Sequence, residues 1–148
     1  METQDYTASI TVNATEKETF DTINNVTAWW TEDLAGGSHN LGDEFTVRFE
    51  DIHVTTQKLI EVTPYTKVVW LVTNSKLNFV EDKHEWTNTT ISFDIAEHDG
   101  QTQIHFTHHG LQPTLQCYNG CSKGWDYFIK GSLFKLLTEG KGTPGIPK

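Results

Sequence analysis

Apolar and polar positions alternate along most of the chain, with the two-residue period that is typical of half-buried strands. The first such run is Tyr6–Val12, and the run Val68–Val72 is apolar on both faces, which indicates a central strand. Further strands are predicted at about 44–50, 52–62, 91–95 and 101–108. A hairpin turn is expected at Asp99–Gly100. Trp86 lies out of phase with the strand that follows it, so it either faces the other side of the sheet or precedes a bulge near Asn88.

Helical signals occur at both ends of this series of strands. Thr15 and Glu18 have the spacing of a capping box, which predicts two short helices between the first strand and Trp30. After Pro113 the apolar period lengthens, and the pattern predicts one long helix that ends near Gly140. Six or seven antiparallel strands and one long helix make a two-layer α+β domain. The 148 residues fit a single domain, with a core at about 6–140 and a C-terminal tail at 141–148.

The net charge of the chain argues against some classes of binding partner. Eleven Lys and Arg against twenty Asp and Glu give a net charge of −9, which argues against a nucleic acid or an anionic membrane surface. No segment is apolar enough for membrane insertion, and Met1–Asp5 lacks the pattern of a signal peptide. We therefore expect a cytoplasmic protein in which Cys117 and Cys121 are free thiols.

Aromatic residues are the main candidates for function, with five Trp, eight Phe and four Tyr in the chain. Seven residues are candidates for contact with a ligand between the sheet and the long helix: Trp30, Phe49, Trp70, Phe106, His108, Trp125 and Phe128. Periodicity alone favours a filled core over a cavity. His108 has the strand parity of Phe106, so it could orient a ligand hydroxyl or carbonyl, or it could bond to the backbone at the end of the strand.

Catalytic and metal-binding motifs have little support. The chain contains no G-x-S-x-G, phosphate-binding loop, G-x-G-x-x-G or H-E-x-x-H sequence. Cys117 and Cys121 are a weak zinc signal. The acidic residues around His84 are typical of a solvated loop. No catalytic residue, metal ligand or cofactor is therefore predicted.

Several blocks occur in a fixed order and together carry a family resemblance. They are Thr15-x-x-Glu18-x-Phe20 with Trp29-Trp30, Gly42-x-x-Phe45, Val68-Val69-Trp70, Glu85-Trp86-x-x-Thr89, Asp99-Gly100-x-Thr102-x-Ile104-x-Phe106-Thr107-His108-x-Gly110-Leu111, Gly124-Trp125-x-x-Phe128-x-x-x-Ser132-Leu133 and Gly140-x-Gly142-x-Pro144. This series resembles the bacterial branch of the activator of heat-shock-protein-90 ATPase homologue family, in the START-like, birch-pollen-allergen-like (SRPBCC) superfamily. The resemblance implies a helix-grip fold, in which a curved sheet wraps around the C-terminal helix and leaves a cavity between them.

Three functions are compatible with this resemblance. The first is non-enzymatic binding of a small hydrophobic or aromatic molecule, such as a lipid or a polyketide-like compound. The second is interaction with a chaperone. The third is a small enzyme that uses the same cavity, with His108 as its reactive group. The aromatic content favours the first.

Overall fold

The computed structural model describes residues 5–145, and within them seven antiparallel strands form one sheet in the order β1-β7-β6-β5-β4-β3-β2. The strands are β1 (Tyr6–Val12), β2 (Leu34–Gly36), β3 (Glu44–Phe49), β4 (His53–Thr63), β5 (Lys67–Leu77), β6 (Thr90–His98) and β7 (Gln101–His109). Two predictions fall partly outside the described residues. These are the absence of a signal peptide, which concerns residues 1–4, and the extent of the C-terminal tail, which includes 146–148.

The alternation in the sequence produces the two faces of the sheet. In β1 every second residue is buried and the others are exposed, as predicted. The β6–β7 hairpin turns at Asp99 and Gly100, whose φ angles are 53° and 80°, the left-handed conformation that a two-residue Asp–Gly turn requires. β7 then pairs with β1, so that Ile10 lies opposite Ile104. The first and the last strand of the chain are thereby paired in one sheet.

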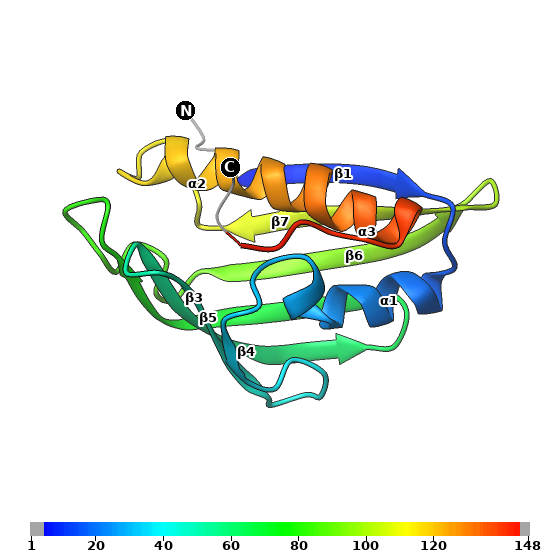
Figure 1. Ribbon diagram of the computed structural model, residues 1–148, viewed down its shortest axis with the longest axis horizontal. Coiled ribbons are helices and arrows are strands. Elements are labelled where there is room, and N and C mark those ends of the chain that lie inside the picture. Colours follow the sequence, from blue (N-terminus) through cyan, green and yellow to red (C-terminus); the bar gives the residue numbers. More distant parts are fainter. Residues whose placement is uncertain (1–4, 146–148) are drawn as a thin grey trace.

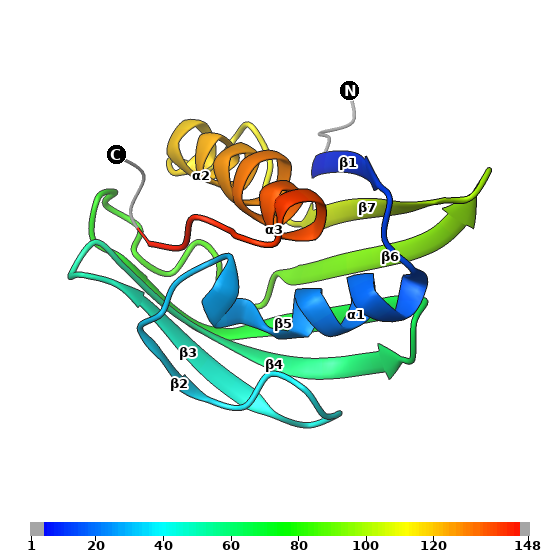
Figure 2. The ribbon, with the colours of Figure 1, turned by 45° about the vertical axis from the view of Figure 1, so that its right-hand side comes forward.

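The sheet curves around the helices. The pairing of β4 with β5 shifts register between Thr56 and Gln57 and again between Leu59 and Glu61, and such bulges bend a strand and increase its twist. Figure 2 shows the sheet bending beneath the C-terminal helix and α1 (Glu16–Asn24), which lie on the same face. The predicted two-layer α+β architecture is confirmed.

Two short helices follow β1, as the sequence predicts. α1 begins with a capping box, in which the Thr15 hydroxyl accepts a hydrogen bond from the Glu18 N–H and the Glu18 carboxylate accepts one from the Thr15 N–H. The single 3-10 turn η1 (Val26–Ala28) follows. It delivers two neighbouring indoles, Trp29 and Trp30, into the space between the sheet and the C-terminal helix.

The C-terminal helix changes its winding along its length. It consists of α2 (Tyr118–Trp125), the π-helical segment η2 (Asp126–Leu133) and α3 (Phe134–Glu139). Gly140, with a φ of 82°, ends it as a left-handed cap. The sequence predicts the helix and its end but not η2, because apolar spacing over two turns does not separate α from π winding. Segments of π-helix are rare and are frequent at functional sites.

Aromatic side chains fill the middle of the molecule. Trp29, Trp70, Phe93 and Phe106 are fully buried. The ring of Phe93 lies 4.9 Å from that of Trp70, 5.1 Å from that of Phe106 and 6.0 Å from that of Trp29. Here the sheet and the C-terminal helix are separated by closely packed rings.

The chain turns back along the C-terminal helix after the helix ends (Figure 1). The Ser132 hydroxyl donates to the Trp29 carbonyl at 2.7 Å and accepts the Thr143 N–H at 2.8 Å. The Gly145 N–H donates to the Trp30 carbonyl at 2.8 Å. Residues 141–145, part of the predicted tail, therefore pack against the loop that carries the two indoles.

Candidate functional site

A cavity of about 420 Å³ opens at one end of the space between the sheet and the C-terminal helix. Small-molecule sites typically enclose about 300–1,000 Å³. The cavity lies between the β3–β4 turn, the β5–β6 loop and the first half of the C-terminal helix, which meet at the left end of Figure 1. Thirteen of the described residues line it: Trp30, Phe49, Ile52, His53, Phe79, Trp86, Gly120, Cys121, Lys123, Gly124, Trp125, Tyr127 and Phe128.

Aromatic rings that brace one another form most of the wall. The ring of Trp125 lies 5.0 Å from that of Trp30 and 5.6 Å from that of Trp86. Phe49 on the sheet meets Phe128 on the helix at 5.5 Å. Offset and tilted ring contacts of this kind contribute about 0.5–1.5 kcal/mol each beyond the area they bury. The wall is therefore held in place by its own packing.

The mouth of the cavity carries exposed apolar side chains. Ile52 and Phe79 are 46% and 45% exposed, and both line the cavity. Phe79 lies over α2, where a methyl group added to Gly120 would stand 3.5 Å from its ring. Exposed apolar groups around a concave apolar surface are typical of a binding site.

Glu85 fixes the β5–β6 loop to the helix. Its carboxylate accepts the backbone N–H groups of Gln116 and Cys117, both at 2.9 Å, just before α2 begins. A carboxylate at this position satisfies unpaired helix donors and interacts favourably with the helix dipole. The Gln116 side chain returns a hydrogen bond by accepting the Asp82 N–H. The loop that supplies Phe79 and Trp86 is thus anchored at the cavity.

His53 is the imidazole in the wall. Its Nε2 lies 3.0 Å from the Thr55 hydroxyl oxygen, which already accepts a hydrogen bond from the Gln57 amide. Nδ1 has no hydrogen-bond partner among the described residues. Burial lowers the pKa of His53 to about 3, so the ring is neutral.

Both cysteines are free and buried. Cys121 lines the cavity, and its sulfur accepts a hydrogen bond from the Trp86 indole at 3.3 Å. The hydrogen bond with Cys117 and burial together raise the pKa of Cys121. A protonated thiol is a poor nucleophile and a poor metal ligand. Cys121 therefore contributes an apolar, polarisable surface that holds Trp86 in place.

The cavity wall contains four of the seven residues that the sequence singles out, namely Trp30, Phe49, Trp125 and Phe128. Trp70 and Phe106 do not line it. They lie in the filled middle of the molecule, where Trp70 stacks on Trp30 at 5.9 Å and Phe106 packs on Trp125 at 4.7 Å. Both rings support the wall from behind.

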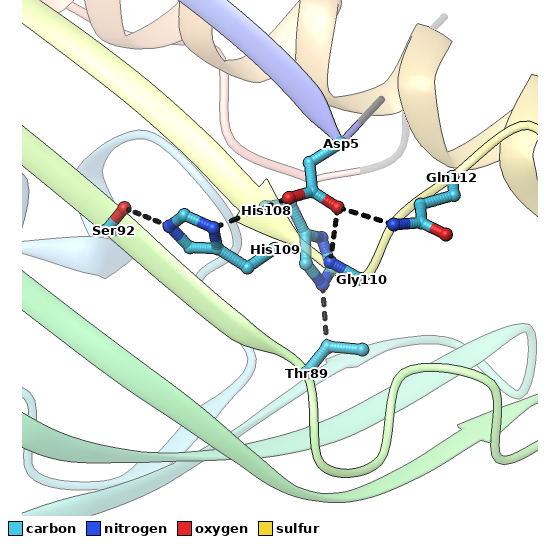
Figure 3. Close-up of polar contacts among 7 residues, drawn as sticks. All are labelled: Asp5, Thr89, Ser92, His108, His109, Gly110 and Gln112. Carbon is cyan, nitrogen blue, oxygen red and sulfur yellow. Dashed lines mark hydrogen bonds and ion pairs between the residues drawn. The ribbon is translucent and has the colours of Figure 1, made fainter. Parts of the chain in front are cut away.

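His108 also lies behind the wall, and both of its ring nitrogens are engaged. Nδ1 accepts the Trp125 indole N–H at 3.0 Å, and Nε2 lies 2.8 Å from the Thr89 hydroxyl oxygen, as Figure 3 shows for Thr89. Since that hydroxyl donates to the Trp86 carbonyl, Nε2 carries the proton. Burial lowers the pKa of His108 to about 3. His108 thus fixes the orientation of Trp125, and it has no nitrogen left for a ligand or a reaction.

Trp86 and Phe79 are contributors that the periodic pattern does not identify. Trp86 is buried yet belongs to the β5–β6 loop, and the turn between it and β6 passes through Asn88 with a φ of 73°. The second of the two alternatives for Trp86, a bulge near Asn88, is confirmed: the Val72 carbonyl accepts the Asn88 N–H and the Val72 N–H donates to the Thr89 carbonyl, so two residues face one residue of β5. Side chains on a loop follow no fixed period. The signal that could have found Trp86 is its place in the family block Glu85-Trp86-x-x-Thr89.

A Ser–His–Asp arrangement lies on the opposite face of the sheet (Figure 3). His109 Nε2 is 3.2 Å from the Ser92 hydroxyl, and Nδ1 is 3.5 Å from the Asp5 carboxylate. Asp5 also accepts the Gly110 N–H and the Gln112 amide. Burial alone would raise the pKa of Asp5, but these donors and His109 hold it below its usual value. Because Ser92 is 4% exposed, we interpret the group as a clamp between the start of β1 and β7.

Residues 5–145 contain neither a metal-binding cluster nor a membrane-spanning helix. In this part of the chain no group of three or more His, Cys, Asp and Glu side chains is arranged to hold a metal ion. No helix in the same range is long and apolar enough to cross a membrane.

These features define the class of the protein as a helix-grip domain, in which a curved antiparallel sheet surrounds a C-terminal helix and an aromatic cavity lies between them. The sequence matches the family described as "Activator of Hsp90 ATPase homolog 1-like protein" over residues 5–138. The chain therefore belongs to this family, as its sequence blocks indicate. No curated protein matches it significantly.

Solved structures share the fold across nearly the whole chain. The Aha1 dimer from Colwellia psychrerythraea is similar with a TM-score of 0.76 and 25% identity, covering 94% of this chain and 99% of that one. Protein SSP2350 from Staphylococcus saprophyticus has a TM-score of 0.72 and 14% identity over 97% and 98% of the two chains. DynU16, described as a putative protein in the dynemicin biosynthetic locus, has a TM-score of 0.65 and 15% identity. The match covers 92% of this chain and 48% of DynU16.

Proposed function

We propose that this protein binds a small hydrophobic or aromatic molecule, such as a lipid or a polyketide-like compound, in the cavity beside α2. The observation that carries the proposal is a preformed cavity of about 420 Å³ whose wall consists mainly of aromatic side chains. Such a wall offers large apolar contact areas with little conformational freedom to lose on binding.

The size of the cavity sets the affinity to expect. Apolar surface contributes about 25 cal/mol per Å² when it leaves water, so a ligand that buries roughly 300 Å² would gain about 7 kcal/mol. Losses of translational and rotational freedom offset part of this gain. We therefore expect dissociation constants in the range of about 0.1 to 1 mM for simple aromatic probes, and tighter binding for the natural ligand.

The residues divide into two groups under this proposal. Trp30, Phe49, Trp86, Trp125 and Phe128 contact the ligand, since they line the cavity. The residues behind them hold these rings in position and do not touch the ligand: Trp70, Phe106 and His108.

Native mass spectrometry of protein purified without organic solvent tests the proposal. We expect a bound small molecule that is released on denaturation, or, for protein that arrives empty, quenching of tryptophan fluorescence by members of a lipid and aromatic panel. A protein that carries nothing and whose fluorescence no member of the panel changes would contradict the proposal.

A second candidate, interaction with a heat-shock-protein-90 chaperone, is supported by the family match and by the net charge of −9. Such an interaction would use the outer surface and not the cavity. Adding the protein to the chaperone and measuring ATP turnover tests it. An unchanged rate together with the absence of a complex in a pull-down would exclude this candidate.

A further inference from the structure

The charge at the cavity differs from that of the rest of the protein. The chain contains twenty Asp and Glu residues and has a net charge of −9. Among the described residues, however, no Asp or Glu lines the cavity, and Lys123 does. The charged side chain at the cavity is therefore positive, although the protein as a whole is negative. A positive charge disfavours a cationic ligand.

Lys123 is available to a ligand. It is exposed and lies on α2, next to Gly124 and Trp125 in the wall. Its ammonium group forms no ion pair with another described residue, whereas Lys130 on the same helix pairs with Asp126 at 3.4 Å. A lysine can lay its methylene groups along an apolar surface and keep its charge in water. Lys123 can therefore cover the edge of the cavity with its charge directed at the mouth.

The unpaired hydrogen-bonding groups of the wall favour the same kind of ligand as the charge of Lys123 does. The Trp30 indole N–H, which is a donor only, and His53 Nδ1 have no described hydrogen-bond partner. The other polar side-chain groups are already bonded, since the Tyr127 hydroxyl donates to the Thr143 carbonyl and the Cys121 sulfur accepts from Trp86. The Trp30 indole and the Lys123 ammonium group are therefore the donors that the wall offers to a ligand, and a carboxylate accepts hydrogen bonds without donating any.

We propose that the ligand is an amphipathic carboxylic acid, with an aromatic or apolar body that fills the cavity and a carboxylate that pairs with Lys123 at the mouth. This inference rests on the proposed binding function and specifies the chemistry of the ligand. Exposed ion pairs contribute modestly, so we expect the carboxylate to raise the affinity about fivefold over a neutral analogue.

Isothermal titration calorimetry with three probes of one shape tests this inference. The probes are naphthylacetate, the neutral naphthylethanol and a naphthylmethyl trimethylammonium salt. On the wild-type protein we expect naphthylacetate to bind about fivefold more tightly than naphthylethanol, with a preference that shrinks as salt is added. Lys123→Gln should remove the preference and leave the affinity for naphthylethanol unchanged. The matched control Lys130→Gln, on the same helix but outside the cavity wall, should keep it.

The outcomes separate the two proposals. Equal affinity of the wild-type protein for naphthylacetate and naphthylethanol, or an equal loss for both probes in Lys123→Gln, would overturn the carboxylate inference and leave the cavity as a binding site. Tighter binding of the ammonium salt would overturn it in favour of a cationic ligand held by the aromatic rings. If none of the three probes binds, the binding function itself is contradicted.

Discussion

Gly124 is a position at which a larger side chain could fill the cavity without displacing neighbouring atoms. It lies in the wall, and a methyl group added there would meet no atom within 4 Å. A phenylalanine side chain has seven carbon atoms. At the packing density of a protein interior each occupies about 20 Å³, so Gly124→Phe occupies roughly 140 Å³, or about a third of the cavity of about 420 Å³. What remains is smaller than the usual range for a ligand site.

The same substitution should not weaken the fold. Glycine inside a helix costs about 1 kcal/mol relative to alanine, so Gly124→Ala should raise the melting temperature by about 2–4 °C and keep ligand binding. Gly124→Phe should melt no lower than the wild type, yet bind naphthylethanol at least tenfold more weakly.

A matched control separates blocking of the cavity from changes in the helix. Gly131 lies on the same helix, also has open space around it, and does not line the cavity, so Gly131→Phe should bind normally. Calorimetry and a thermal melt on all four proteins measure these effects. Normal binding by a folded Gly124→Phe protein would show that the ligand lies elsewhere and would refute the reasoning.

Three further predictions concern the framework of the site. Burial lowers the pKa of His108 to about 3 from an ordinary 6.5. As the pH falls, this histidine therefore takes up a proton in the unfolded chain before it does so in the folded protein. Its contribution to the free energy of unfolding is full above pH 6.5 and is lost as the pH drops towards 3. Between pH 7 and pH 5 this histidine should cost about 2 kcal/mol, measured by urea unfolding, and His108→Gln should show a shallower loss. Glu85→Gln, which removes the carboxylate at the start of α2, should lower the free energy of unfolding by about 1 kcal/mol. Gly142→Val should cost about 1–3 kcal/mol, because its Cβ would stand 2.5 Å from the Ala28 carbonyl oxygen.

Each of these predictions has a control. Glu81→Gln alters an exposed loop carboxylate that forms no hydrogen bond or ion pair with the described residues of α2, and Lys141→Ala alters an exposed neighbour of Gly142. Neither should change the free energy of unfolding by more than about 0.5 kcal/mol. If Glu81→Gln is as costly as Glu85→Gln, or if the slope with pH is the same with and without His108, the corresponding explanation is wrong.

The sequence predicts the strands and helices well because their signals are local. The alternation in β1, the capping box at Thr15 and the glycine at the end of the C-terminal helix each depend on a few neighbouring residues. The winding of η2 is not local in this sense, since it depends on how the whole helix packs. At the start of η2, for example, Asp126 accepts a hydrogen bond from the Tyr6 hydroxyl, 120 positions earlier in the chain.

The position of the cavity could not be predicted for a related reason. Strand parity correctly directs Trp70 and Phe106 towards the helix, but it does not reveal what fills the space beside them. Trp29 and Trp30 occupy that space because η1 and the returning C-terminal segment hold their loop there. The cavity therefore lies at the end of the sheet. Its wall there includes Trp86, which belongs to a loop and has no periodic spacing that the sequence could reveal.

The five indole N–H signals in a ¹⁵N-correlated NMR spectrum provide the most direct measurement, because the tryptophans divide into two groups. Trp30, Trp86 and Trp125 line the cavity, whereas Trp29 and Trp70 lie in the filled core. On titration with naphthylethanol we expect large, saturable shifts for the first three signals and small ones for the other two. Unchanged spectra, or shifts confined to Trp29 and Trp70, would contradict the claim that the cavity beside α2 is the binding site.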